Sequence, residues 1–204
     1  MSEKEILKIF KSEKALLSGH FLLSSGLHSP EYMQCATLFQ KPWIGQTLCQ
    51  ALAKKLKGLK MDAVIGPALG GVLVSYEMGR ALKIRSIFAE RPPAPWADRP
   101  GGVDGTFVLR RGFTLKKGEK VLVVEDVVTT GKSIYEVIDL VNHVGAKVVA
   151  VASIVDRSAG VAIFESPFFS LLTIMIKTYK PEACPLCREG RVPVVKPGSR
   201  TITA

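Results

Sequence analysis

Two acidic residues and a glycine-containing turn stand together in the stretch VLVVEDVVTTGKS, residues 121–133. Its apolar start predicts a buried strand that brings Glu125 and Asp126 to its end. The residues that follow, Thr129–Ser133, predict a turn into a helix N-terminus, where free backbone N–H groups and hydroxyls bind phosphate. Because carboxylates accept hydrogen bonds from sugar hydroxyls, this pattern favours a site for a sugar phosphate. The structural alternative is a helix cap at Thr129 or Thr130, with acids that pair with a nearby lysine.

The same stretch ends like a nucleotide-binding P-loop but lacks the start of one. The P-loop pattern is G-x-x-x-x-G-K-[ST], and Gly131-Lys132-Ser133 would supply its last three positions. The first glycine would then have to be residue 126, which is Asp126. A carboxylate there would repel phosphate, and its side chain would block close approach of the backbone. We therefore expect the loop to bind neither ATP nor GTP.

The elements around this loop alternate between strands and helices. Helical spacing covers the N-terminus, 42–59, 72–82 and 133–143, and apolar strand patterns cover 63–65, 85–89, 121–124, 147–155 and 168–174. Such alternation predicts an α/β fold with a central parallel sheet that helices cover on both faces. The segment GHFLLSSGLHSPEY, with its turn signals, predicts a small hairpin before the sheet.

Three of the predicted strands end in loops that could bind a ligand: GPALGG, EDVVTTGKS and DRSAG. In parallel sheets, ligands lie at the carboxyl ends of the strands, so these loops should meet at one crevice. The segment 90–107 holds four prolines and three glycines, which exclude a regular element. A loop of this length in a compact domain is typical of an active-site lid.

Composition limits the range of partners. The net charge is +10, but the basic residues are dispersed and aromatic residues are few, so we expect small anionic substrates rather than nucleic acid. No apolar run reaches the ~18–20 residues of a membrane helix. The N-terminus lacks the apolar stretch of a signal peptide. These patterns predict a cytoplasmic protein that does not bind membranes.

The four cysteines include one C-x-x-C pair, Cys184 and Cys187. A structural zinc site usually requires four ligands, commonly two such pairs or one pair with histidines. No second pair exists, and His20, His28 and His143 are distant in sequence. We therefore favour a tight Cys-Pro turn, with a redox pair or a shared metal site as the alternatives.

The stretch VLVVEDVVTTGKS resembles the 5-phosphoribosyl-1-diphosphate (PRPP) signature of type I phosphoribosyltransferases. Further segments resemble the orotate phosphoribosyltransferases in order along nearly the whole chain. They are GHFLLSSGLHSPEY, GPALGGV, FVLRRGF, IVDRSAG and CPLCREG…VPVVKPGSR. The resemblance implies the type I phosphoribosyltransferase fold, as one domain over 1–204 with a small N-terminal hood over about 1–40.

The resemblance also implies a role for each matching residue. Glu125 and Asp126 would hold the ribose hydroxyls, and Thr129 and Arg157 would contact orotate, whose planar anion suits a guanidinium. GPALGG would bind the diphosphate, and Ser24–Met33 would close over the base. The PRPP-binding set comprises Arg91, Glu125, Asp126, Val127, Val128, Thr129, Thr130, Gly131, Lys132 and Ser133.

The lid departs from the family pattern. Family lids usually carry Arg/Lys-Lys-Glu…Lys…His, whereas this one reads Glu90-Arg91-Pro92-Pro93. Arg91 stands at the usual lysine position, and we expect it to be catalytic together with Asp126. Further charge would come from Arg99, or from Arg110 and Arg111, unless these three are solvated surface residues. Ser24 and Gly70 also stand where other family members carry lysines.

The implied reaction joins orotate and PRPP to give orotidine 5-phosphate and diphosphate, in pyrimidine synthesis. The family uses Mg²⁺ on the diphosphate and ribose hydroxyls, and no protein side chain is expected as a metal ligand. The resemblance further implies a homodimer whose lids reach into the partner's site. Two alternatives remain open: a phosphoribosyltransferase for another base, and a non-catalytic PRPP-binding regulator.

Overall fold

A five-stranded parallel sheet forms the centre of the molecule. The computed structural model describes residues 1–23, 25–92 and 106–197 of the chain. The strand order is β4-β3-β5-β6-β7, and every neighbouring pair is parallel. The strands are β3 Ala63–Pro67, β4 Arg85–Ala89, β5 Lys120–Val128, β6 Lys147–Asp156 and β7 Phe168–Thr173. The inner strands are runs of Val, Ile, Leu and Ala because both of their faces are buried.

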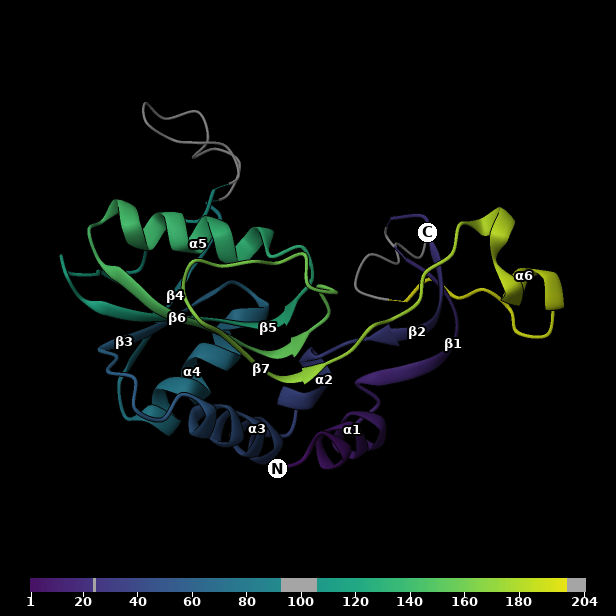
Figure 1. The fold of residues 1–204 in the computed structure, drawn as a ribbon, viewed down its shortest axis with the longest axis horizontal. Helices are drawn as coiled ribbons and strands as arrows, with labels where there is room; N and C mark the ends of the chain where they lie inside the picture. Colours follow the sequence, from purple (N-terminus) through teal and green to yellow (C-terminus); the bar gives the residue numbers. More distant parts are fainter. Residues whose placement is uncertain (24, 93–105, 198–204) are drawn as a thin grey trace.

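Helices cover both faces of this sheet (Figure 1). On one face, α3 (Pro42–Lys55) and α4 (Gly70–Leu82) pack with the N-terminal α1 (Glu3–Ser12), and the other face is covered by α5 (Lys132–His143). Each face has its own hydrophobic cluster, the first centred on residues such as Leu48, Leu52 and Met78, the second on Ile134, Val137 and Val141. The predicted α/β fold is confirmed.

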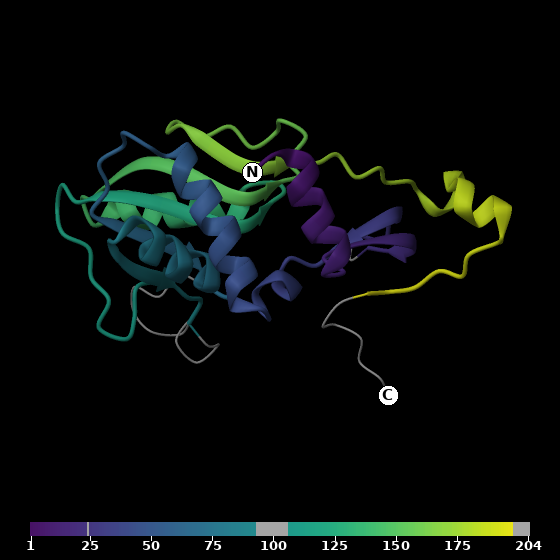
Figure 2. The same ribbon diagram turned by 90° about the horizontal axis from the view of Figure 1, so that it is seen from below.

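A hairpin lies beyond one end of the sheet. It consists of β1 (Leu16–Leu22) and β2 (His28–Met33), and it is followed by the short helix α2 (Ala36–Phe39). The chain returns to this hairpin after β7, through a 3-10 turn, η2 (Pro181–Ala183), and the one-turn helix α6 (Pro185–Glu189). Figures 1 and 2 both show the hairpin and α6 together at the same end of the molecule.

The predicted boundaries differ from the observed ones mainly at the ligand-binding edge. The fifth strand continues through both acids to Val128, because β6 pairs with it as far as Val128↔Asp156. The fourth helix begins at Gly70 rather than Val72, and the short helices α2 and α6 had no clear sequence pattern. In the described part of the chain, no helix is long and apolar enough to cross a membrane.

The C-x-x-C segment forms the predicted turn, but separation in sequence did not predict where two of the histidines lie. Cys184 caps α6 and Pro185 occupies its first turn. His20 and His28, although distant in sequence, lie beside both cysteines. They are brought there because the chain after β7 runs back along the hairpin, with backbone hydrogen bonds between His28 and Tyr179.

Candidate active site

The three candidate loops meet at the carboxyl ends of their strands. The backbone N–H of Arg157, after β6, donates to the carbonyl of Val128, on β5, at 2.8 Å. The GPALGG loop packs against β5 so closely that a Cβ on Gly70 would lie 2.6 Å from Asp126 Oδ1. The loops after β3 and β6 therefore both lie beside β5, and β5, β6 and β7 point toward the hairpin (Figure 1).

The turn between β5 and α5 has the form of an anion cradle. Gly131 caps α5 in the left-handed conformation, with φ of 78°, so the chain can reverse within two residues. Exposed Thr129 and Thr130 precede it, and the Thr130 hydroxyl faces the Lys132 N–H at 3.4 Å. A hollow of about 70 Å³ is lined by Glu125 and residues 127–134. Free N–H groups at the start of a three-turn helix favour an anion here.

Of the two acids next to this cradle, Glu125 is buried and Asp126 is half-buried. Glu125 is 9% exposed, and burial, with repulsion from Asp126, raises its pKa to about 9. Burial also raises the pKa of Asp126. Backbone N–H groups partly offset this cost, since Val127 N–H donates to Asp126 Oδ1 at 2.8 Å. No described lysine pairs with either acid, so the alternative of a cap with a lysine–acid pair does not explain them.

Arg157 and Asp126 border the same small region. The thiol of buried Cys35, which directly precedes α2, has its pKa raised by burial and by Asp126 and lowered by Arg157. Both charges thus act on the same thiol. Sequence reasoning did not single out Cys35, because a lone cysteine after a strand has no distinguishing pattern. Arg157 itself is half-buried, and its backbone N–H joins the strand that carries the acids.

Comparison with known proteins decides the family. The Phosphoribosyl transferase domain model matches residues 35–179. An orotate phosphoribosyltransferase from Carboxydothermus hydrogenoformans is 56% identical over 198 residues, covering 96% of this chain and 97% of that one. The chain belongs to the orotate phosphoribosyltransferases. Another from Thermotoga maritima is 51% identical over 195 residues, covering 96% of this chain and 98% of its own length.

Solved structures agree with this family fold. The orotate phosphoribosyltransferase from Aeropyrum pernix superposes with a TM-score of 0.62 at 26% identity, covering 82% of this chain and 93% of that one. The sheet order and flanking helices of the present phosphoribosyltransferase are thus those of the type I fold.

In this phosphoribosyltransferase, the described arginines that flank residues 93–105 in sequence contact acids outside the cradle. Arg91 donates to Glu136, on α5, at 2.6 Å, and its guanidinium lies 4.1 Å from the centre of the Phe107 ring. Glu90 accepts from Arg111 at 3.0 Å and lies 3.5 Å from Arg110. Ser24 and residues 93–105, including Arg99, lie outside the described residues.

Gly131→Ala should weaken phosphate binding and stability together. A Cβ at Gly131 would keep the unfavourable positive φ and would also lie 3.0 Å from Tyr135 and 3.2 Å from Ala162. Gly118→Ala is the matched control, because Gly118 has the same φ of 78° and nothing within 4 Å of its Cβ position. Both variants should lose about 1 kcal/mol of unfolding free energy from the backbone. Only Gly131→Ala should also raise KM for PRPP; equal KM values in the two variants would contradict the cradle.

The acid pair should make the enzyme less stable as the pH rises. The carboxyl of Glu125 ionises near 4.5 in the unfolded chain but only near 9 when folded. Between these values the folded state holds more protons, so the unfolding free energy falls with rising pH, by on the order of 3 kcal/mol from pH ~4.5 to ~7. Urea denaturation across this range should show that fall, and Glu125→Gln should reduce its slope. An unchanged slope in Glu125→Gln would exclude Glu125 as the source.

Proposed function

We propose that the crevice at the carboxyl ends of β3, β5 and β6 transfers the 5-phosphoribosyl group from PRPP to orotate. The main observation is that the acids with their phosphate cradle and an arginine suited to an anionic base lie at the same edge of the sheet. Strand β5 supplies the acids and the phosphate cradle. Arg157 follows the neighbouring strand, β6, and its backbone N–H donates to the carbonyl of Val128, on β5, at 2.8 Å. Family membership at 56% identity supports the same reaction.

We propose that PRPP lies along β5 with its 5-phosphate in the cradle of residues 129–133. Glu125 and Asp126 then face the ribose hydroxyls, which donate hydrogen bonds to their carboxyl oxygens. GPALGG lies on the other side of Asp126 and would receive the diphosphate. Gly70 has no side chain there because Asp126 fills the space, so a lysine at this position would displace the carboxylate.

Orotate would occupy the region between β6 and the hairpin. Arg157 pairs with its carboxylate or ring oxygens in a planar arrangement, and Thr129 adds a hydroxyl. The segment 24–33 would cover the base and exclude water from the cationic ribose of the transition state. Positioning and charge stabilisation then supply most of the rate.

Mg²⁺ is the proposed cofactor. Adjacent carboxyls at a strand end are hard oxygen donors of the kind this ion accepts, and the ion usually takes most other ligands from substrate phosphates and water. When bound, it neutralises charge on the leaving diphosphate. We propose that the substrate and water supply its ligands, and that Glu125 and Asp126 act through the ribose hydroxyls.

We further propose a homodimer with shared active sites. Arg91 supports this arrangement, because it pairs with Glu136, on α5, and no ion pair of the described residues joins it to Glu125 or Asp126. The pair is exposed, with 40% of the Arg91 side chain accessible, so it costs little to separate. A cytoplasmic location stays a prediction.

Arg91→Ala should lower kcat about 10²-fold while KM for PRPP changes little, because one cation aimed at the transition state contributes about 2–4 kcal/mol. Glu136→Gln is the matched control, since it removes the other half of the ion pair and leaves Arg91 present. It should keep nearly full activity. Initial rates of both variants show whether activity depends on Arg91 itself or only on its ion pair with Glu136. An unchanged kcat in Arg91→Ala would remove this residue from the mechanism.

The choice of base is tested by initial rates with a panel of orotate, uracil, adenine and guanine, each with PRPP and Mg²⁺. We expect turnover with orotate and at least about 10³-fold lower kcat/KM with the others, because a site built to pair a charged group rejects analogues that lack it. Higher kcat/KM for any purine would assign the enzyme to another base.

A further inference from the structure

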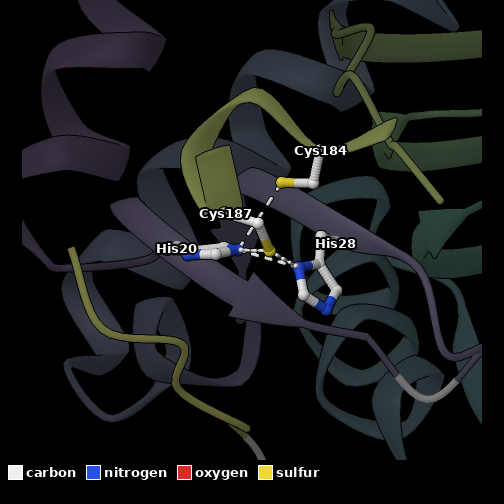
Figure 3. Close-up of side chains that lie close together, drawn as sticks. All are labelled: His20, His28, Cys184 and Cys187. Carbon is white, nitrogen blue, oxygen red and sulfur yellow. Dashed lines mark hydrogen bonds between the residues drawn. The ribbon is translucent and has the colours of Figure 1, made fainter. Parts of the chain in front are cut away.

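A second site, separate from the active site, is formed by two histidines and two cysteines. His20 lies on β1, His28 at the start of β2, and Cys184 and Cys187 around the first turn of α6 (Figure 3). The ligand atoms of all four side chains lie within 4.8 Å of one another. In Figure 3 they point inward from three separate segments toward a common centre.

The distances match those of a tetrahedral metal site. His20 Nε2 lies 3.6 Å from Cys184 Sγ and 3.6 Å from Cys187 Sγ, and His28 Nδ1 lies 3.2 Å from Cys187 Sγ. Zinc bonds of about 2.3 Å to sulfur and about 2.05 Å to nitrogen place tetrahedral S···N pairs about 3.6 Å apart. The two nitrogens are 2.8 Å apart, so an opening of about 0.5 Å would complete the set.

The outer nitrogen of His20 is already held in the way that metal-binding histidines are held. His20 Nδ1 lies 3.1 Å from the carbonyl oxygen of Val192, an acceptor only. Nδ1 must therefore carry the proton, which leaves the Nε2 lone pair facing the two sulfurs. Three of the four ligands are buried: His20 is 3% exposed, His28 8% and Cys184 0%.

The segment that carries Cys184 and Cys187 has no hydrophobic core of its own. We call residues 177–197 the C-terminal arm, and all of it is described. Its single buried residue is Cys184, and neither hydrophobic cluster of the described chain includes any of its residues. Backbone hydrogen bonds at Tyr179 and Val195 attach it to both edges of the hairpin. A segment without a hydrophobic core commonly depends on a metal or a disulfide for its order.

We propose that His20, His28, Cys184 and Cys187 bind one Zn²⁺ ion that fastens the C-terminal arm to the β1–β2 hairpin. Two thiolates and two imidazoles in a tetrahedral set are the ligands of structural zinc. Four protein ligands leave no open position, so the role is structural and not catalytic. The site lies on a different part of the chain from the acids of β5, and it requires no particular substrate.

The test measures zinc on the full-length chain, purified under reducing conditions without added chelator. Elemental analysis should give about one equivalent of zinc per chain. After removal of zinc, Co²⁺ titration should produce the intense visible bands of a tetrahedral thiolate site, with saturation at about one equivalent. The double substitution Cys184→Ser and Cys187→Ser should abolish both signals. His143→Gln, a histidine on α5 outside the cluster, should retain them.

Hydrogen exchange gives a second measurement that does not depend on activity. Peptides covering 177–197 and the hairpin should exchange at least about tenfold faster in the zinc-free chain than in the zinc-bound chain, while peptides of β5 and β6 stay protected. Less than about a tenth of an equivalent of zinc, with no Co²⁺ bands, would overturn the proposal. So would a mass spectrum showing a Cys184–Cys187 disulfide in a chain that takes up no zinc.

Discussion

Replacing Asp126 with asparagine should lower kcat/KM for PRPP by about 10²- to 10³-fold while the chain remains folded. The carboxylate lies between the cradle and the GPALGG loop, and the amide has nearly the same shape. Asparagine cannot carry the negative charge that stabilises a cationic ribose. Since burial raises the pKa of Asp126, removing its charge should not reduce stability at neutral pH.

The matched control for this variant is Asp139→Asn. Asp139 is an exposed acid on α5, so its loss changes the net charge equally without touching the crevice. Rates come from the fall of orotate absorbance at several PRPP concentrations, and urea denaturation checks the fold. If Asp126→Asn and Asp139→Asn had equal kcat/KM, Asp126 would have no part in catalysis.

Arg157→Ala should raise KM for orotate by about 30- to 100-fold and leave the dissociation constant of PRPP nearly unchanged. A charge-assisted pair between a guanidinium and a carboxylate contributes about 2–3 kcal/mol in a partly buried site. The effect should fall on the base alone because Arg157 follows β6, whereas the cradle belongs to β5.

Arg80→Ala serves as the control for Arg157→Ala. Arg80 is an exposed arginine on α4 that pairs with Glu77, one turn earlier on the same helix. Its removal should change neither constant. Orotate kinetics give KM for orotate, and calorimetric titration gives the dissociation constant of PRPP. A loss of PRPP affinity as large as the loss for orotate would mean that Arg157 holds the loop and not the base.

The layout of the sheet could be predicted because its strands and helices have distinct periods. Continuous apolar runs such as 147–155 are typical of strands buried on both faces, and the helix 133–143 repeats its apolar residues every three to four positions. The short helices could not be predicted, since α2 and α6 have too few residues for a period to appear. Their positions follow from packing and caps.

The candidate site likewise has one part that the sequence predicts and another that only the fold brings together. The acids and the glycine turn form a local pattern, so the sequence predicts that Glu125, Asp126 and Gly131 lie together. Their neighbours come from other strands: the approach of Gly70 to Asp126 and the position of Cys35 depend on how the loops meet. Likewise His20 and Cys184 are 164 positions apart, and only the return of the C-terminal arm to the hairpin brings them together.

The departures in the lid have a partial physical explanation. Glu90 pairs with both Arg110 and Arg111, and Arg91 stacks on Phe107 while pairing with Glu136. These contacts order the base of the lid with arginines where the family pattern has lysines. The histidine of the family's lid pattern is missing from this sequence, and no contact of the described residues accounts for its absence.

We propose that one crevice joins the two substrates and does not merely bind PRPP. Phosphorus NMR of the purified chain with orotate, PRPP and Mg²⁺ tests it most directly, because substrate and both phosphorylated products have separate signals. We expect PRPP to be replaced by equal amounts of orotidine 5-phosphate and diphosphate, at a rate proportional to enzyme concentration. Retention of bound PRPP without either product would contradict the account and favour a non-catalytic regulator.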